Sequence, residues 1–252
     1  MSAGEILAIA LAGLAAGTIN TVVGSGTLIT FPVLLAFGYA PVTANVSNTV
    51  GLVPGSASGA VGYRRELAGQ GARALRLGAV SIAGGITGAV LLLVLPASAF
   101  KAIVPVFIAL ALVLIVAQPR LAQALAARRL GRERGHEHGP LVALAIYLTG
   151  VYGGYFGAAQ GILLLGILGA ALAQDLQRTN ALKNVLAGLV NGVAGVYFAL
   201  VAHVDWGPAA IIACASVLGA QLGARYGRRL APGALRVVIV LVGVFAIVRL
   251  LA

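Results

Sequence analysis

The stretch GTINTVVGSGTLITFP, residues 17–32, decides the fold because it interrupts an apolar segment that runs from Ile6 to Ala40. It places three glycines, an asparagine, a serine and four threonines where a membrane helix would carry apolar side chains. Two interpretations are open: a loop between two ordinary helices, or irregular backbone at membrane depth. Irregular backbone at that depth is tolerated only where protein or a wet cavity surrounds it.

The composition indicates a polytopic all-α membrane protein. The 252 residues are 60% hydrophobic and 9% charged, whereas a soluble domain carries roughly 25% charged residues. Charge-free stretches cover residues 7–62, 77–98 and 141–174, long enough for membrane spans. The net charge of +11 comes from arginines between apolar runs, which favours a role in membrane topology over binding of nucleic acid.

The chain reads as an internal duplication. Overlaying the second half on the first pairs residues in preserved order: Gly13 with Gly150, Gly17 with Gly154, Gly24 with Gly161, Asn48 with Asn184, Gly84 with Gly219, and Gly88 with Gly223. We therefore predict a first repeat at 1–118, a basic linker at 119–139 and a second repeat at 140–252.

Each repeat begins with a glycine-broken apolar segment, at about 5–40 and 140–174. Three uninterrupted helical stretches of membrane-spanning length follow in each half, at about 42–62, 75–95 and 98–118, then 183–202, 207–224 and 232–252.

The basic residues predict that the two repeats have opposite orientations. Four clusters can all lie on one side, which the positive-inside rule makes cytoplasmic. They are Arg64, Arg65, Arg73 and Arg76; Arg120, Arg128, Arg129, Arg132 and Arg134; Arg178 and Lys183; and Arg225, Arg228, Arg229 and Arg236. Corresponding loops differ in charge, since YRRELAGQGAR matches HVDWG. We expect an inner-membrane protein with a cytoplasmic linker and both termini outside.

This topology predicts that the broken segments turn back on themselves. Segment 140–174 lies between two cytoplasmic clusters, so it enters and leaves from one side. The arms 5–19 and 27–40 would be roughly 20–22 Å long as helices, short of the ~30 Å hydrocarbon core. We therefore expect two re-entrant or broken hairpins whose tips meet near the midplane.

The tips and the polar helix starts are the candidate substrate site. The second arm of each hairpin begins at its tip, and a helix N-terminus favours an anion. The candidate binding residues are Asn20, Thr21, Gly24, Ser25, Gly26, Thr27, Asn45, Asn48, Tyr155, Gln160, Gly161, Asn180, Lys183 and Asn184.

Structural roles compete with this assignment. Paired glycines, such as Gly13 and Gly17 or Gly188 and Gly192, are typical of close helix packing. The asparagines can cap helices or bond between them. Lys183 can either extend to the cytoplasmic surface or attract an anion.

The sequence predicts neither an enzyme nor a metal or cofactor site. The acidic residues fall at segment ends or in loops, which argues against a carrier of metal cations. No nucleophile–base set lies within an apolar segment, so there is no candidate catalytic residue. His136 and His138 are more typical of a solvated linker than of a metal site.

Two motifs resemble those of the sulfite exporter TauE/SafE family, also called the 4-toluene sulfonate uptake permease family. They are AGTINTVVGSGTLITFPVLLAFGYAPVTANVSNTVG and TGVYGGYFGAAQGILLLGILG followed by TNALKNVLAG. The resemblance covers both halves and implies a bacterial inner-membrane carrier of sulfite, sulfonates or related anions. Its glycine-rich segment falls on Asn20, Gly24, Ser25, Gly26 and Pro32. Many members carry a lysine in the first Thr-Asn motif, where this chain has Asn48.

We therefore expect a transporter of small anions, of the sulfur oxyanion or organosulfonate type, that alternates access to a midplane site. An anion channel of the same fold and a non-transporting membrane scaffold or partner protein are the alternatives. The expected partners are a small anion and the lipid bilayer, not nucleic acid, and the small-residue stripes permit a homodimer.

Overall fold

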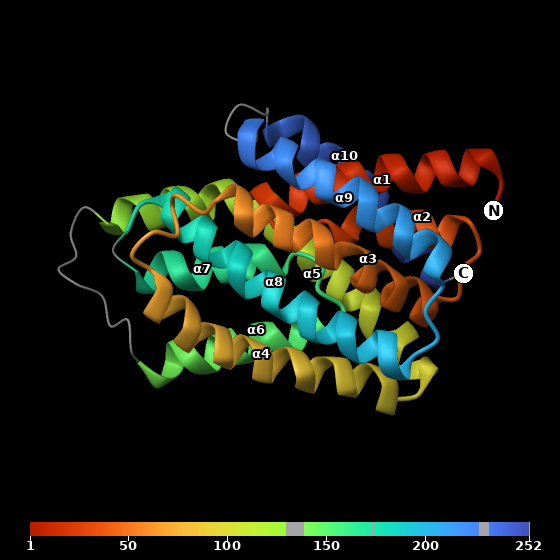
Figure 1. Ribbon diagram of the computed structural model, residues 1–252, viewed down its shortest axis with the longest axis horizontal. Helices are drawn as coiled ribbons and strands as arrows, with labels where there is room; N and C mark the ends of the chain where they lie inside the picture. Colours follow the sequence, from red (N-terminus) through yellow and green to blue (C-terminus); the bar gives the residue numbers. More distant parts are fainter. Residues whose placement is uncertain (130–138, 173, 227–231, 252) are drawn as a thin grey trace.

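The protein is a bundle of α-helices that run mostly along the longest axis of the molecule (Figure 1). The computed structural model describes residues 1–129, 139–172, 174–226 and 232–251. Within these residues the helices are α1 (Ala3–Val22), α2 (Thr27–Ala36), α3 (Pro41–Gly62), α4 (Gly71–Val94), α5 (Ala97–Arg129), α6 (Pro140–Tyr155), α7 (Gln160–Ala171), α8 (Leu176–Val201), α9 (Trp206–Tyr226) and α10 (Pro232–Leu251). The described part of the chain contains no strand.

Local sequence signals set several helix starts. The Ser2 side chain caps α1 and forms a capping box with Glu5. The Asp175 carboxylate accepts the amide N–H groups of Gln177 and Arg178, both at 2.9 Å, and so begins α8. The predicted start of this helix at 183 is therefore wrong, and Lys183 lies two turns inside it. Helix α5 continues to Arg129, so the first part of the predicted linker at 119–139 is helical, and residues 130–138 lie outside the described residues.

The exterior of the bundle suits a membrane. Among the described residues, α1, α4, α8, α9 and residues 97–117 of α5 are long and apolar enough to cross one, by length and composition. Large apolar side chains cover the outside, and Leu75 and Leu200 are more than three quarters exposed. Such a surface is stable in hydrocarbon and would aggregate in water. The protein is therefore a multi-pass membrane protein.

Small residues allow the helices to approach closely. A Cβ on Gly17 of α1 would lie 2.2 Å from the carbonyl oxygen of Ser216 in α9. A Cβ on Gly88 of α4 would lie 2.0 Å from the carbonyl oxygen of Val151 in α6. The packing interpretation is confirmed for these glycines. It is wrong for Gly192, where a Cβ would meet nothing within 4 Å.

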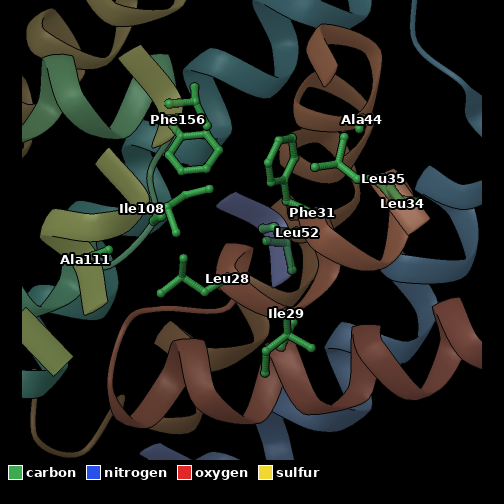
Figure 2. Close-up of a cluster of buried hydrophobic side chains, with 14 of the residues drawn as sticks. Leu28, Ile29, Phe31, Leu34, Leu35, Ala44, Leu52, Ile108, Ala111 and Phe156 are labelled. Atoms are coloured by element: carbon green, nitrogen blue, oxygen red, sulfur yellow. The ribbon is translucent and has the colours of Figure 1, made fainter. Parts of the chain in front are cut away.

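The core joins the two broken segments. The ring of Phe31, from α2, packs edge-on against the ring of Phe156, which follows α6, with 5.1 Å between their centroids. Figure 2 shows these rings among Leu28, Leu52 and Ile108. The two broken segments therefore lie against each other inside the bundle.

The first hairpin differs from its prediction. Its first arm, expected at 5–19, extends to Val22, so α1 has 20 residues and the length of a membrane span. Thr18 and Thr21, expected in the turn, are helical because their hydroxyls donate to the carbonyls of Leu14 and Gly17, both at 2.9 Å. Tyr152 and Tyr155 are likewise inside α6. The turns are confined to residues 23–26 and 156–159.

Candidate functional site

Two turns meet at the centre of the site. The amide of Gly161, in the first turn of α7, donates to the carbonyl of Gly24 at 3.1 Å. A Cβ on Gly24 would lie 2.3 Å from the Cα of Gly161, so neither position has room for a side chain. Gly24 also has φ +86, a left-handed conformation that favours glycine. The two glycines that the alignment of the repeats matches are therefore in direct contact.

Lys183 is fully buried beside this contact, with 0% of its surface exposed. Its Nζ donates to the carbonyl oxygens of Asn20 and Thr21, at 3.1 and 3.2 Å. Its stem passes Gly161, where a Cβ would lie 2.9 Å from the lysine Cδ. The alternative in which Lys183 extends to the surface is therefore wrong. The amine lies instead at the C-terminal end of α1, where the helix dipole favours a cation.

Two asparagines of α8 hold the same end of α1. The Asn180 and Asn184 amides donate to the Thr21 carbonyl, at 3.3 and 3.2 Å. With Lys183, three side chains of α8 thus converge on one carbonyl of the first hairpin. The asparagines are not caps, since Asp175 caps this helix.

The asparagines of α3 bind both hairpins. Asn45 donates to the carbonyl of Tyr155 at 3.0 Å. Asn48 donates to the hydroxyl of Thr27 at 3.3 Å and accepts a hydrogen bond from Thr30. Because α3 begins at Pro41, neither asparagine is at a capping position. Both act as bonds between helices, one of the alternatives that the sequence left open.

The start of α2 presents unpaired donors. The amides of Ser25, Gly26 and Thr27 donate to no described residue, and the Leu28 amide is the first to pair, with the Ser25 carbonyl at 3.2 Å. The Ser25 hydroxyl, 1% exposed, is also without a partner among the described residues. Buried donors of this kind fit an anion.

The start of α7 differs from that of α2. Its Gln160 amide N–H donates to the Gly157 carbonyl at 3.3 Å, and its Gly161 amide N–H donates to the Gly24 carbonyl. The sequence predicts an anion at both helix N-termini, but the first two amides of α7 are already bonded to carbonyl groups. The Gln160 side chain instead supplies an unpaired donor, Nε2, and lies against Gly153, where a Cβ would be 2.4 Å from that nitrogen.

The fourteen predicted residues lie inside the bundle. All fourteen are buried except Asn20, which is half-buried. The prediction missed Ser56, whose hydroxyl accepts the amides of Asn20 and Asn191, at 3.4 and 3.0 Å. Helical periodicity could have identified it. Ser56 lies three helical turns after Asn45 and therefore on the same face of α3, and Asn191 lies three turns after Asn180 on the same face of α8.

A separate cavity of about 420 Å³ lies between α4, α5, α6 and α7. Its lining includes Leu91, Leu148 and Phe107, and the polar residues Thr149, Tyr152 and Tyr155. It has no cation and no amide side chain, so its chemistry suits an apolar molecule rather than an anion. The polar cluster at the turns is therefore the candidate substrate site.

Comparison with known proteins agrees with this architecture. The family model described as sulfite exporter TauE/SafE matches residues 9–250. The chain is 28% identical to a probable membrane transporter protein, ORF9, of Sinorhizobium sp, over 96% of this chain and 90% of that protein. It is 26% identical to the probable membrane transporter protein YfcA of Escherichia coli K12, over 83% of this chain and 76% of that protein. No solved structure matches. The chain therefore belongs to the sulfite exporter TauE/SafE family of membrane transporters.

Proposed function

We propose that the protein carries small anions, sulfur oxyanions or organosulfonates, across the inner membrane through a site between the two turns. The observation that carries this proposal is Lys183. It is fully buried and forms no ion pair with any described residue. A buried charge without a counter-charge is costly, and such a residue in a membrane segment is a candidate for substrate binding.

The unpaired donors beside the lysine support an anion as the substrate. The Ser25 hydroxyl and the amides of Gly26 and Thr27 adjoin Gly24, and Gln160 adjoins Gly161. Since Gly24 and Gly161 touch, these donors come from both sides of one contact. Hydroxyl and amide donors with one cation fit the oxygens of a sulfite or sulfonate group.

Helix contacts support the proposal that the two halves are repeats that pack as equivalents. Their inverted orientation is inferred from the distribution of basic residues. Exchanging α1–α5 for α6–α10 turns the contact of α1 with α9 into that of α6 with α4. It also turns the contact of α3 with α9 into that of α8 with α4, and that of α2 with α10 into that of α7 with α5. Inverted repeats with broken helices are a common layout of carriers that alternate access.

A polar network beside the α3–α4 turn is a candidate gate. The Arg73 guanidinium donates to the side-chain oxygens of Gln70 and Gln174, at 3.4 and 3.0 Å. Gln70, 1% exposed, donates to the Arg178 carbonyl at 3.1 Å. These bonds join the start of α4, in the first repeat, to the start of α8, in the second. Under alternating access these bonds would break when the site opens toward the side of the membrane on which the α3–α4 turn lies.

Flux into proteoliposomes across an anion panel tests the function. We expect saturable uptake of sulfite or 4-toluenesulfonate and none of sodium or potassium. Flux that fails to saturate would favour the anion channel. Transport of no anion would favour the non-transporting scaffold.

Alanine variants test the site. Asn20→Ala, Asn48→Ala and Asn184→Ala should each lower transport, by roughly 10- to 150-fold where the amide bonds a charged substrate, which is worth about 1.5–3 kcal/mol. Gln221→Ala is the control, because that amide is exposed and bonds Ser58, which is not a predicted site residue. Unchanged flux in all three variants, with folded protein, would move the site elsewhere.

A further inference from the structure

We propose that Lys183 couples transport to protons: it binds one proton together with each anion and releases both on the same side. This inference rests on the proposed anion transport. It adds a second transported ion and assigns it to a single residue.

The hydrogen bonds of Lys183 suit a group that gains and loses a proton. A neutral amine has two N–H donors, and an ammonium has three. The structure supplies two acceptors, the carbonyls of Asn20 and Thr21, at 3.1 and 3.2 Å. The third N–H of the ammonium has no acceptor among the described residues. An anion would supply both that acceptor and the counter-charge.

Among the described residues, no carboxylate is bonded to Lys183 in place of the anion. The elements packed against α8 are α3, α4, α6 and α7, and α1 supplies the two carbonyls. Neither α3 nor α7 contains a titratable residue. The titratable groups on the others and on α8 itself are Glu5 in α1, Arg73 and Arg76 in α4, Tyr147, Tyr152 and Tyr155 in α6, and Arg178 and Tyr197 in α8.

None of these groups forms a hydrogen bond or an ion pair with Lys183. Glu5 accepts the hydroxyl of Tyr39 at 2.7 Å, and Arg178 donates to the carbonyl of Ala68 at 2.9 Å. A charged Lys183 therefore depends on the anion, and the anion on the charged lysine. Two ligands that each favour the other's binding are linked reciprocally, so the proton and the anion bind and leave together.

The charge balance of the step is simple. The amine R–NH₂ takes up one proton to become R–NH₃⁺, which pairs with one monovalent anion, and the reverse step releases both. No net charge crosses with a monovalent anion. A pH gradient should therefore drive uptake, and membrane potential should not.

Proton counting in proteoliposomes tests the coupling. The probe is 4-toluenesulfonate, since a sulfonate is a strong acid and carries no proton itself, and a trapped dye reports internal pH while potassium and valinomycin hold the potential at zero. We expect the wild type to acidify the lumen by about one proton per anion, the stoichiometry of a single titrating amine.

Variants separate binding from coupling. Lys183→Arg should still bind 4-toluenesulfonate but move no protons, because a guanidinium stays protonated. Lys183→Met should lose both saturable uptake and acidification. Lys101→Met is the matched control, because Lys101 is exposed on α5, and should behave as wild type.

The outcomes distinguish the inference from the proposed function. Uptake of 4-toluenesulfonate without protons, or at a rate independent of pH, overturns the coupling and leaves anion transport intact. Uptake of neither 4-toluenesulfonate nor sulfite overturns both. If Lys183→Met does not fold, as judged by its elution profile, the wild-type stoichiometry and Lys183→Arg decide the question.

Discussion

At Gly161 the absence of a side chain makes room for two neighbours. A Cβ there would lie 2.5 Å from the Cα of Gly24 and 2.9 Å from the Cδ of Lys183. The same small residue thus lets the two turns touch and lets the lysine reach the end of α1. Packing and the candidate site depend on one position, so a change at this contact should affect both.

Gly24→Ala should destabilise the protein more than Gly38→Ala. Both glycines have φ +86, so both alanines carry the same left-handed strain. A Cβ on Gly24 would lie 2.3 Å from the Cα of Gly161, whereas a Cβ on Gly38 would meet nothing within 4 Å. The extra cost of crowding at Gly24 is about 1–3 kcal/mol. Thermal melting in detergent measures it.

Gly38→Ala serves as the control for strain alone, since the difference between the two variants isolates the contact. For a chain of this size, 1 kcal/mol corresponds to roughly 2–4 °C in melting temperature. Equal melting temperatures would mean that the turns do not touch in the membrane.

The helices accommodate polar residues in ways that depend on their neighbours. Thr18 and Thr21 both bond to their own helix, and Thr18 also donates to the carbonyl of Gly219 in α9, so α1 continues through a stretch rich in polar residues. In α3 and α8 the asparagines bond to other elements instead. A polar residue in an apolar segment therefore does not by itself mark the end of a helix.

Gly17→Ala should separate α1 from α9 and destabilise the bundle by about 1–3 kcal/mol. Its Cβ would lie 2.2 Å from the carbonyl oxygen of Ser216, and a backbone atom cannot rotate away. Thermal melting again measures the change.

Gly192→Ala is the opposite case in a helix interior. It meets nothing within 4 Å, so it should stabilise α8 by about 0.5–1 kcal/mol through helix propensity. Destabilisation by both variants to the same extent would contradict the described packing of α1 against α9.

The arrangement of the whole bundle depends on contacts between the two halves. The helix pairs with the most extensive contacts, α1 with α9, α3 with α9 and α4 with α6, each combine one helix from each half. The core likewise combines Phe31 of α2 with Phe156 (Figure 2). Neither half would bury its small-residue faces alone, so we expect the two to fold as one unit.

Cysteine labelling tests the proposed topology. In a Cys214→Ser background, Ala68→Cys lies before α4 and His203→Cys between α8 and α9. With inverted repeats and cytoplasmic basic clusters, an impermeant thiol reagent should label Ala68→Cys only from the inside and His203→Cys only from the outside. Labelling of both from one side would contradict the topology.

The sequence by itself determined the class, the family and most of the helices. Charge-free stretches identify membrane helices because bilayer thickness fixes their length, and each family motif can be read within a local stretch of one half. The glycines and asparagines of the site were likewise visible, because polar groups inside apolar segments are costly without partners. Two helix boundaries were predicted wrongly. The arm expected at 5–19 extends to Val22, because threonine hydroxyls bond to the backbone of the same helix. The helix expected to start at 183 starts at Leu176, because Asp175 caps it.

Only the tertiary structure decided which of these residues meet. It brought Lys183 of the second half to the end of α1 in the first. It left the donors of Ser25 unpaired while pairing the backbone amides of Gln160 and Gly161 at the start of α7. No local pattern encodes such pairs, because they depend on how far two helices approach, and that distance is set by glycines more than 100 residues apart in the chain, such as Gly24 and Gly161. The side chains that can bind an anion are written in the sequence, but the place where they converge is a property of the packed bundle.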